Sequence, residues 1–172
     1  MVWVRALIIL FVVNGLITPV AFGDQGTDKT VVIHVKTVPA DDASRFYSIA
    51  RLTIAALDKG QRVIMLYDGN GAEVVKLGSW YGGDTTLLDK LDIPDAEQES
   101  LAGSLGLTKA STPSNYGDLM RLFRGKGVEL YVSGDMMRHH KITDDKYDNV
   151  FIPIEPARML EIFDRADVYL SY

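Results

Sequence analysis

Residues 30–67 read TVVIHVKTVPADDASRFYSIARLTIAALDKGQRVIMLY, and this stretch decides the fold. The β-branched run from Thr30 to Val38 is typical of a strand that is buried on both faces. Apolar residues recur at helical spacing from Phe46 to Leu57, and Gly60 suits the position that follows a helix end. A second apolar run, Gln61 to Tyr67, completes the pattern. The stretch therefore predicts a strand–helix–strand unit with parallel strands.

The rest of the chain continues this alternation of strands and helices. We expect helices over 72–77, 94–105 and around 119–123, strands over 128–132, 148–153 and 167–171, and a last helix from Pro156. Strands that alternate with helices favour a parallel sheet covered on both faces. The predicted fold is thus a single α/β domain, a three-layer α/β/α and flavodoxin-like structure with a mostly parallel five-stranded sheet.

The first 23 residues have the anatomy of a secretory signal peptide. Arg5 precedes an apolar stretch, and Ala21-Phe22-Gly23 places small residues at the −3 and −1 positions of a cut before Asp24. The alternative is an uncleaved membrane anchor, which Asn14 and Pro19 disfavour. We expect a signal peptide over 1–23, a single domain over 24–172, a periplasmic or secreted location, and no stable membrane anchor after cleavage.

Composition excludes several kinds of function. The net charge is −5, and an acidic protein is a poor generic partner for nucleic acid. The chain contains no cysteine, so its own residues supply no thiolate metal ligand, no cysteine nucleophile and no persulfide carrier. We also expect no cofactor.

Two loops that follow predicted strands are the candidate ligand-binding segments. In an open α/β sheet, ligands bind outside the carboxyl ends of the strands. Asp68, Gly69, Asn70 and Gly71 follow the second strand, and their glycines allow the backbone to approach a ligand. The candidates after the strand at 128–132 are Ser133, Gly134, Asp135 and Arg138. With Pro39 to Asp42 after the first strand, these loops are expected to surround one crevice.

Three stretches resemble the DsrE/DsrF-like sulfur-relay family. They are VVIHVKTVPADDASRFYSIARLTIAALDKGQRVIMLYDGNGAEVVKLG (31–78), YGDLMRLFRGKGVELYVSGDMMRHHKI (116–142) and EPARMLEIFDRADVYLSY (155–172). The resemblance covers most of the chain after residue 23, and its more specific parts are GVELYV with the turn that follows and the closing ADVYLSY. It implies a small α/β/α domain that often forms homo-oligomers. In several members, the domain passes sulfane sulfur as a cysteine persulfide.

The family cysteine falls at Ser133 in this sequence, and a second cysteine of some members falls among Asp135, Met136 and Met137. A serine hydroxyl cannot form a persulfide. We therefore expect no persulfide transfer, no catalytic residue, and a role in binding a small ligand or a partner protein, with a link to sulfur metabolism implied by the resemblance.

Alternatives remain open around Ser133. A serine hydrolase needs a base beside the hydroxyl, and the sequence has no Gly-x-Ser-x-Gly turn; a strand-end donor or a helix cap is the favoured role. His139 and His140 are weak candidates for metal ligands together with Asp135 or Asp144, although adjacent helical residues point about 100° apart. Arg138 favours a small anion. The Gly69-x-Gly71 spacing lacks the third glycine of a dinucleotide fingerprint.

Two further hypotheses concern larger assemblies. Trp80 and Tyr81, beside Gly82-Gly83, are aromatic residues of the kind enriched at interfaces, and we expect them at an oligomer contact. One alternative to a binding protein is an enzyme or metal carrier that uses Ser133, Asp135 and the histidines. The other is a structural subunit of an oligomer that binds no small ligand.

Overall fold

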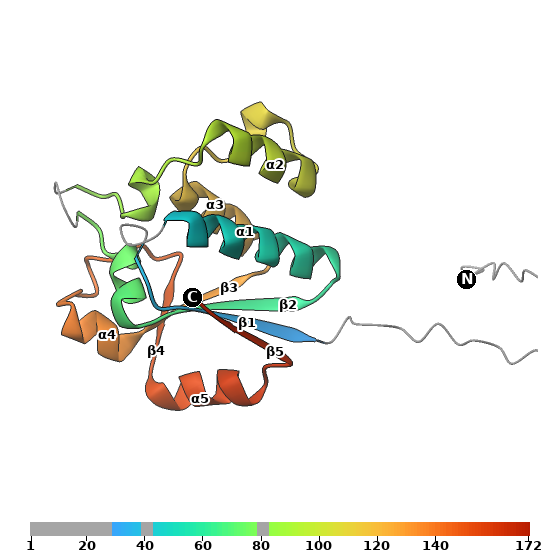
Figure 1. The fold of residues 1–172 in the computed structure, drawn as a ribbon. Helices are drawn as coiled ribbons and strands as arrows, with labels where there is room; N and C mark the ends of the chain where they lie inside the picture. The colour runs from blue at the N-terminus through green and yellow to red at the C-terminus, as the bar shows by residue number, and fades with distance from the viewer. Residues whose placement is uncertain (1–28, 39–42, 79–82) are drawn as a thin grey trace, which may run out of the picture.

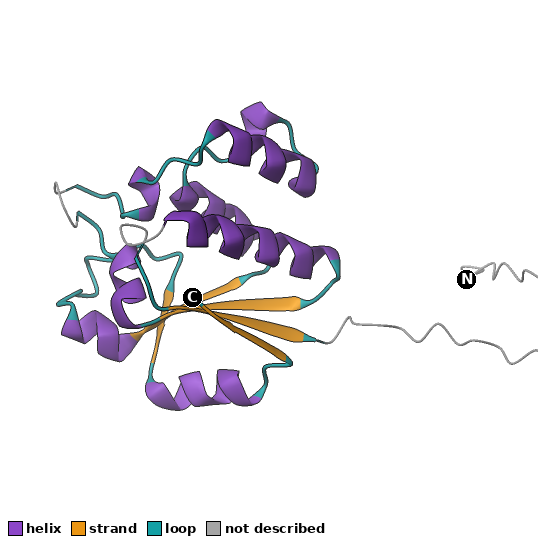
Figure 2. Cartoon of the chain, viewed as in Figure 1, coloured by secondary structure: helices purple, strands orange, loops and turns teal. Residues whose placement is uncertain are grey.

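The computed structural model describes residues 29–38, 43–78 and 83–172, and five of its strands form one parallel sheet between helices (Figures 1 and 2). The strand order is β4-β3-β2-β1-β5, and every neighbouring pair is parallel. The elements are β1 (Thr30–Val35), α1 (Ala43–Asp58), β2 (Arg62–Tyr67), η1 (Gly69–Val75), η2 (Leu88–Lys90), α2 (Asp95–Leu105), η3 (Lys109–Ser111), α3 (Tyr116–Gly125), β3 (Glu129–Ser133), α4 (Gly134–His139), β4 (Ile152–Ile154), α5 (Pro156–Asp164) and β5 (Val168–Ser171).

The direction in which the chain crosses the sheet explains which face each helix covers. The chain moves from β1 to β2 to β3 across the sheet, so right-handed connections place α1 and α3 on the same face. It returns from β4 past three strands to β5, and the same handedness therefore places α5 on the opposite face. Figure 1 shows this arrangement, with α2 outside α1 and α3 and with α4 beyond the end of β3. The predicted three-layer, flavodoxin-like α/β/α fold is confirmed.

Each face of the sheet has its own core. The face that α1 and α3 cover holds the larger cluster, in which Phe46, Tyr67 and Phe123 are fully buried. The α5 face holds a smaller cluster made of Val32, Ile64, Leu66, Tyr131, Ile154 and Ile162. Because side chains alternate along a strand, His34 lies on the same face as Val32, toward the carboxyl end of β1.

Several predicted boundaries were wrong. The strand expected over 148–153 begins at Ile152, because Asp148 directs a turn in which its carboxylate accepts from the Val150 N–H at 3.0 Å. The short helix expected over 72–77 is the 3₁₀ helix η1, which begins at Gly69. The segment between the helices expected over 94–105 and around 119–123 contains η3 and the start of α3, where the side chain of Asn115 accepts from the Asp118 N–H at 2.8 Å.

Two expectations concern residues outside the described ranges. These are the signal peptide over 1–23 and the oligomer contact at Trp80 and Tyr81. Among the described residues, none of the helices has the length and apolar content needed to cross a membrane.

The loop after β2 is packed directly on the end of β1. The Gly71 N–H donates to the Lys36 carbonyl at 3.1 Å, and a Cβ on Gly71 would lie 2.3 Å from the Val35 carbonyl oxygen. A side chain at this position would therefore push η1 away from β1.

We predict that Gly71→Ala destabilises the fold by about 3 kcal/mol, because the new methyl meets backbone that cannot move aside. Gly103→Ala is the control: this exposed position in α2 has open space around it, so the substitution should stabilise by roughly 0.5–1 kcal/mol. Urea unfolding measures both. Equal stability of Gly71→Ala and the parent protein would contradict the packing described for η1.

Candidate functional site

The structure brings two of the three predicted loops together at the carboxyl edge of the sheet. Leu66 of β2 pairs with Tyr131 of β3, so Asp68 and Ser133, each two residues further along, lie at the same level and on the same face. Helix α4 packs on η1, where a ring nitrogen of His140 lies 3.0 Å from the Gly69 carbonyl oxygen. The third segment, 39–42, is outside the described residues.

Ser133 caps α4. Its side chain is buried, with the residue 3% exposed, and its Oγ accepts from the Met136 N–H at 3.4 Å. This outcome confirms the expectation of a helix cap. The following Gly134 is also enclosed, because a Cβ there would lie 3.0 Å from a carboxylate oxygen of Glu155.

Arg138 is engaged with two carboxylates. Its guanidinium donates to Asp135 and, through two nitrogens, to both carboxylate oxygens of Glu155 at 3.0 Å. The guanidinium holds the pKa of Glu155 below its ordinary range. Two negative groups therefore offset the one positive charge, and Arg138 gives the site no net attraction for the small anion expected from the sequence.

The two adjacent histidines have different surroundings. The ring of His140 bridges Gly69 and the Glu73 carboxylate, with its Nδ1 at 2.8 Å from Glu73, and it therefore fastens α4 to η1. His139 is exposed and its ring packs against that of His140. Within the described ranges, no three His, Cys, Asp or Glu side chains gather in a way that could hold a metal ion.

The candidate residues in the loop after β2 differ in how far they are buried. Gly71 is buried against β1, whereas Asn70 is exposed at the tip of the loop. Asp68 is different from both, because its carboxylate turns toward β1.

Asp68, the residue after β2, is one end of a hydrogen-bonded chain of three side chains that continues to β1 and β5. Its Oδ2 lies 3.2 Å from Nε2 of His34, and Nδ1 of His34 lies 2.6 Å from the hydroxyl of Tyr169 on β5. The ring of Phe163 covers the imidazole at a centroid distance of 5.4 Å. His34 is 5% exposed, so the imidazole at the centre of this chain is enclosed by the sheet, α5 and its two partners.

The electrostatics of His34 follow from this enclosure. Burial lowers its pKa, and the hydrogen bond to Asp68 opposes that effect. The imidazole is therefore neutral near pH 7. A carboxylate accepts hydrogen bonds, so Nε2 carries the proton toward Asp68 and Nδ1 accepts from the Tyr169 hydroxyl.

Sequence reasoning placed Asp68 in the site but did not identify His34 or Tyr169 as its partners. The sequence did contain one indication: the run TVVIHV, expected to be a buried strand, includes a histidine. A buried polar side chain needs a hydrogen-bond partner, so this histidine predicts that one lies nearby. The partner itself depends on β5 lying beside β1, and the sequence alone does not give that strand order.

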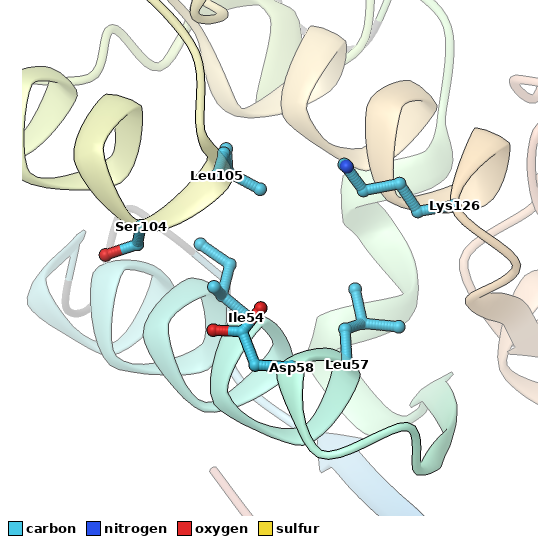
Figure 3. A pocket seen from close by; sticks show the side chains of 6 residues that line it. All are labelled: Ile54, Leu57, Asp58, Ser104, Leu105 and Lys126. Carbon is cyan, nitrogen blue, oxygen red and sulfur yellow. The ribbon is translucent and has the colours of Figure 1, made fainter. Parts of the chain in front are cut away.

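A separate hollow of about 300 Å³ lies between α1, α2 and the end of α3 (Figure 3). Because α1 ends at Asp58 just before β2 begins, this hollow is at the amino edge of the sheet, away from Asp68 and Ser133. Its lining residues are Ile54, Leu57, Asp58, Ser104, Leu105 and Lys126.

Comparisons with known proteins show the fold. No protein-family model matches the chain, and no curated protein matches it. A solved structure of a protein of unknown function, MTH1491 from Methanobacterium thermoautotrophicum, is similar with a TM-score of 0.51 and 14% identity over 84% of this chain and 100% of that one. The ychN protein from E. coli gives a TM-score of 0.48, 14% identity, and coverage of 84% and 99%. The first likeness supports the α/β/α fold and leaves the DsrE/DsrF-like family as a resemblance.

We predict that His34 makes the fold less stable in mild acid. Its pKa in the folded protein is below the ordinary value of 6.5, so the unfolded chain takes up a proton there first. The free energy of unfolding should therefore be at its full value above pH 6.5 and fall as the pH drops toward the folded-state pKa. Urea unfolding at about pH 7.5 and about pH 5.5 measures the change.

The control is His34→Gln, which keeps a polar side chain and removes the titrating group. Its stability should change less between the two pH values than that of the parent protein. An equal change in both proteins would mean that His34 is not protonated differently in the folded and unfolded states.

Proposed function

We propose that this protein is an exported, DsrE-like binding protein that holds a small ligand or a partner protein at the carboxyl edge of its sheet and performs no persulfide transfer. The observation that carries this proposal is the role of Ser133, which stands at the family cysteine position and caps α4. A link to sulfur metabolism comes from the resemblance.

The chemistry around Ser133 supports a binding role over a catalytic one. A serine nucleophile needs a base within hydrogen-bond reach. Here the Ser133 hydroxyl contacts the Met136 amide, both ring nitrogens of His140 face η1, and His139 is exposed. The alternative of an enzyme built on Ser133 and these histidines therefore lacks its nucleophile–base pair in the described residues.

The position of the loops supports binding. Parallel strands present their carboxyl ends along one edge, where connecting loops form ligand sites in α/β folds. Thr37 follows β1 at this edge, and within the described part of the chain its hydroxyl oxygen is buried without a hydrogen-bond partner. A ligand that reaches this edge would find an unused hydroxyl there.

We also propose that the protein forms a homo-oligomer. Leu160 on the outer side of α5 is 63% exposed, more than any other large hydrophobic side chain in the described ranges. Subunit contacts bury apolar side chains, and Leu160 is free to take part in one.

We predict that the new thiol in Ser133→Cys reacts slowly with polysulfide, because position 133 is buried and faces the first turn of α4. Asp135→Cys is the matched control, two residues away at an exposed position. Mass spectrometry after polysulfide treatment should show persulfide on the control and little on Ser133→Cys. Comparable labelling of the two variants would show that the sulfur-relay pocket is intact, against the proposal.

Native mass spectrometry of the exported protein tests binding itself. We expect more than one subunit and a bound small molecule or a co-purified protein. Asn70→Trp should remove that species, because its ring would occupy the carboxyl edge from an exposed loop position. Asn149→Trp, also at an exposed position but in a different loop, should retain it. Retention in both variants, or a parent protein with nothing bound, would contradict a ligand at this edge.

A further inference from the structure

We propose that Asp68, His34 and Tyr169 form a proton relay that makes the Tyr169 hydroxyl a nucleophilic site for activated acyl groups. The proposal goes beyond the binding role proposed above, because it assigns a reactive group to a different part of the surface. It rests on the contacts of these three side chains and does not depend on Ser133 or on the loop tip at Asn70.

The sheet register builds the relay. β1 pairs with β2 on one side and with β5 on the other, so a side chain of β1 can contact both neighbours. Asp68 follows the end of β2 and reaches Nε2 of His34 at 3.2 Å. Tyr169 is opposite Val32 in the register and reaches Nδ1 of His34 at 2.6 Å. The order carboxylate–imidazole–hydroxyl is that of an acyl-transfer triad, with the phenol in place of serine.

The direction of the hydrogen bonds makes His34 a base for the phenol. Asp68 holds the Nε2 proton and would stabilise the imidazolium that forms when Nδ1 takes a second proton. Burial keeps the ring neutral near pH 7, so the Nδ1 lone pair is available. The charged and titratable groups that act on His34 are Asp68, Lys36 and the Tyr169 hydroxyl, and Lys36 opposes protonation.

Tyr169 is the accessible end of this chain. The residue is 47% exposed, whereas His34 is 5% exposed. The phenol ring is held by the pairing of β5 with β1 and by an edge contact with Phe163 at a centroid distance of 5.6 Å. The base is therefore shielded from water, whereas the tyrosine that it contacts is half exposed, so an electrophile would approach the phenol from its solvent side.

The step is an acyl transfer without any change of oxidation state. The Tyr169 oxygen forms a bond to the carbonyl carbon as its O–H bond breaks, and the proton passes to Nδ1 of His34. The bond between the carbonyl carbon and the leaving group then breaks, and the leaving group takes the proton from Nδ1. The products are an aryl ester on Tyr169 and the protonated leaving group.

N-acetylimidazole is a direct probe, since it acetylates tyrosine and releases imidazole. Full-length protein is treated near pH 7, and peptide mass spectrometry measures the acetylation rate of each tyrosine. We expect Tyr169 to react at least about tenfold faster than the partly exposed Tyr47, Tyr147 and Tyr172. The excess should disappear in mild acid, where protonated His34 no longer accepts the phenolic proton.

Two variants separate the relay from simple exposure. Asp68→Asn keeps the side-chain shape and removes the charge that stabilises the imidazolium, and His34→Leu removes the base. Both should bring the Tyr169 rate down to that of Tyr172, with circular dichroism and thermal unfolding as checks on the fold. A parent Tyr169 rate equal to that of Tyr172, or an unchanged excess in folded Asp68→Asn, would overturn the proposal.

Discussion

The interior position of β1, between β2 and the edge strand β5, is the constraint on which the rest of the structure depends. All six residues of β1 are buried, and both edges of the strand are paired, with β2 on one side and β5 on the other. Such a strand must satisfy every backbone group through its neighbours, which fixes their register. The same register gives the buried imidazole of His34 two polar neighbours. A misplaced β5 would leave that ring without the Tyr169 hydroxyl and would bury an unsatisfied nitrogen.

At the carboxyl edge, several of the side chains that the sequence marked as candidates have structural roles. Ser133, Arg138 and His140 are engaged in capping α4, in pairing with carboxylates and in fastening α4 to η1. The side chains that look most reactive in the sequence are therefore already engaged in structural contacts. Tyr169 differs from these residues, because it is half exposed and its hydroxyl contacts the buried ring of His34.

The fold could be predicted from the sequence because the patterns that indicate it are local. Buried strands, helical spacing and Pro156 at a helix start all depend on neighbours within a few residues, and the parallel order of strands and helices follows from their alternation. The role of Ser133 as a cap was also local. The contact between His34 and Tyr169 could not be predicted in this way. The two residues are 135 positions apart in the sequence, and they meet through a strand pairing that no short motif encodes. Asp148 misled the prediction of β4 because its side chain directs a turn in an apolar stretch.

The protonation state of His34 tests the central feature of this account most directly. Nitrogen-15 NMR of uniformly labelled protein near pH 7 distinguishes the two ring nitrogens and reports which of them carries the proton. The account predicts a neutral ring with the proton on Nε2, facing Asp68, and an unprotonated Nδ1 that accepts from Tyr169. A proton on Nδ1, or a doubly protonated ring at this pH, would contradict both the hydrogen-bond direction and the role assigned to His34 as a base.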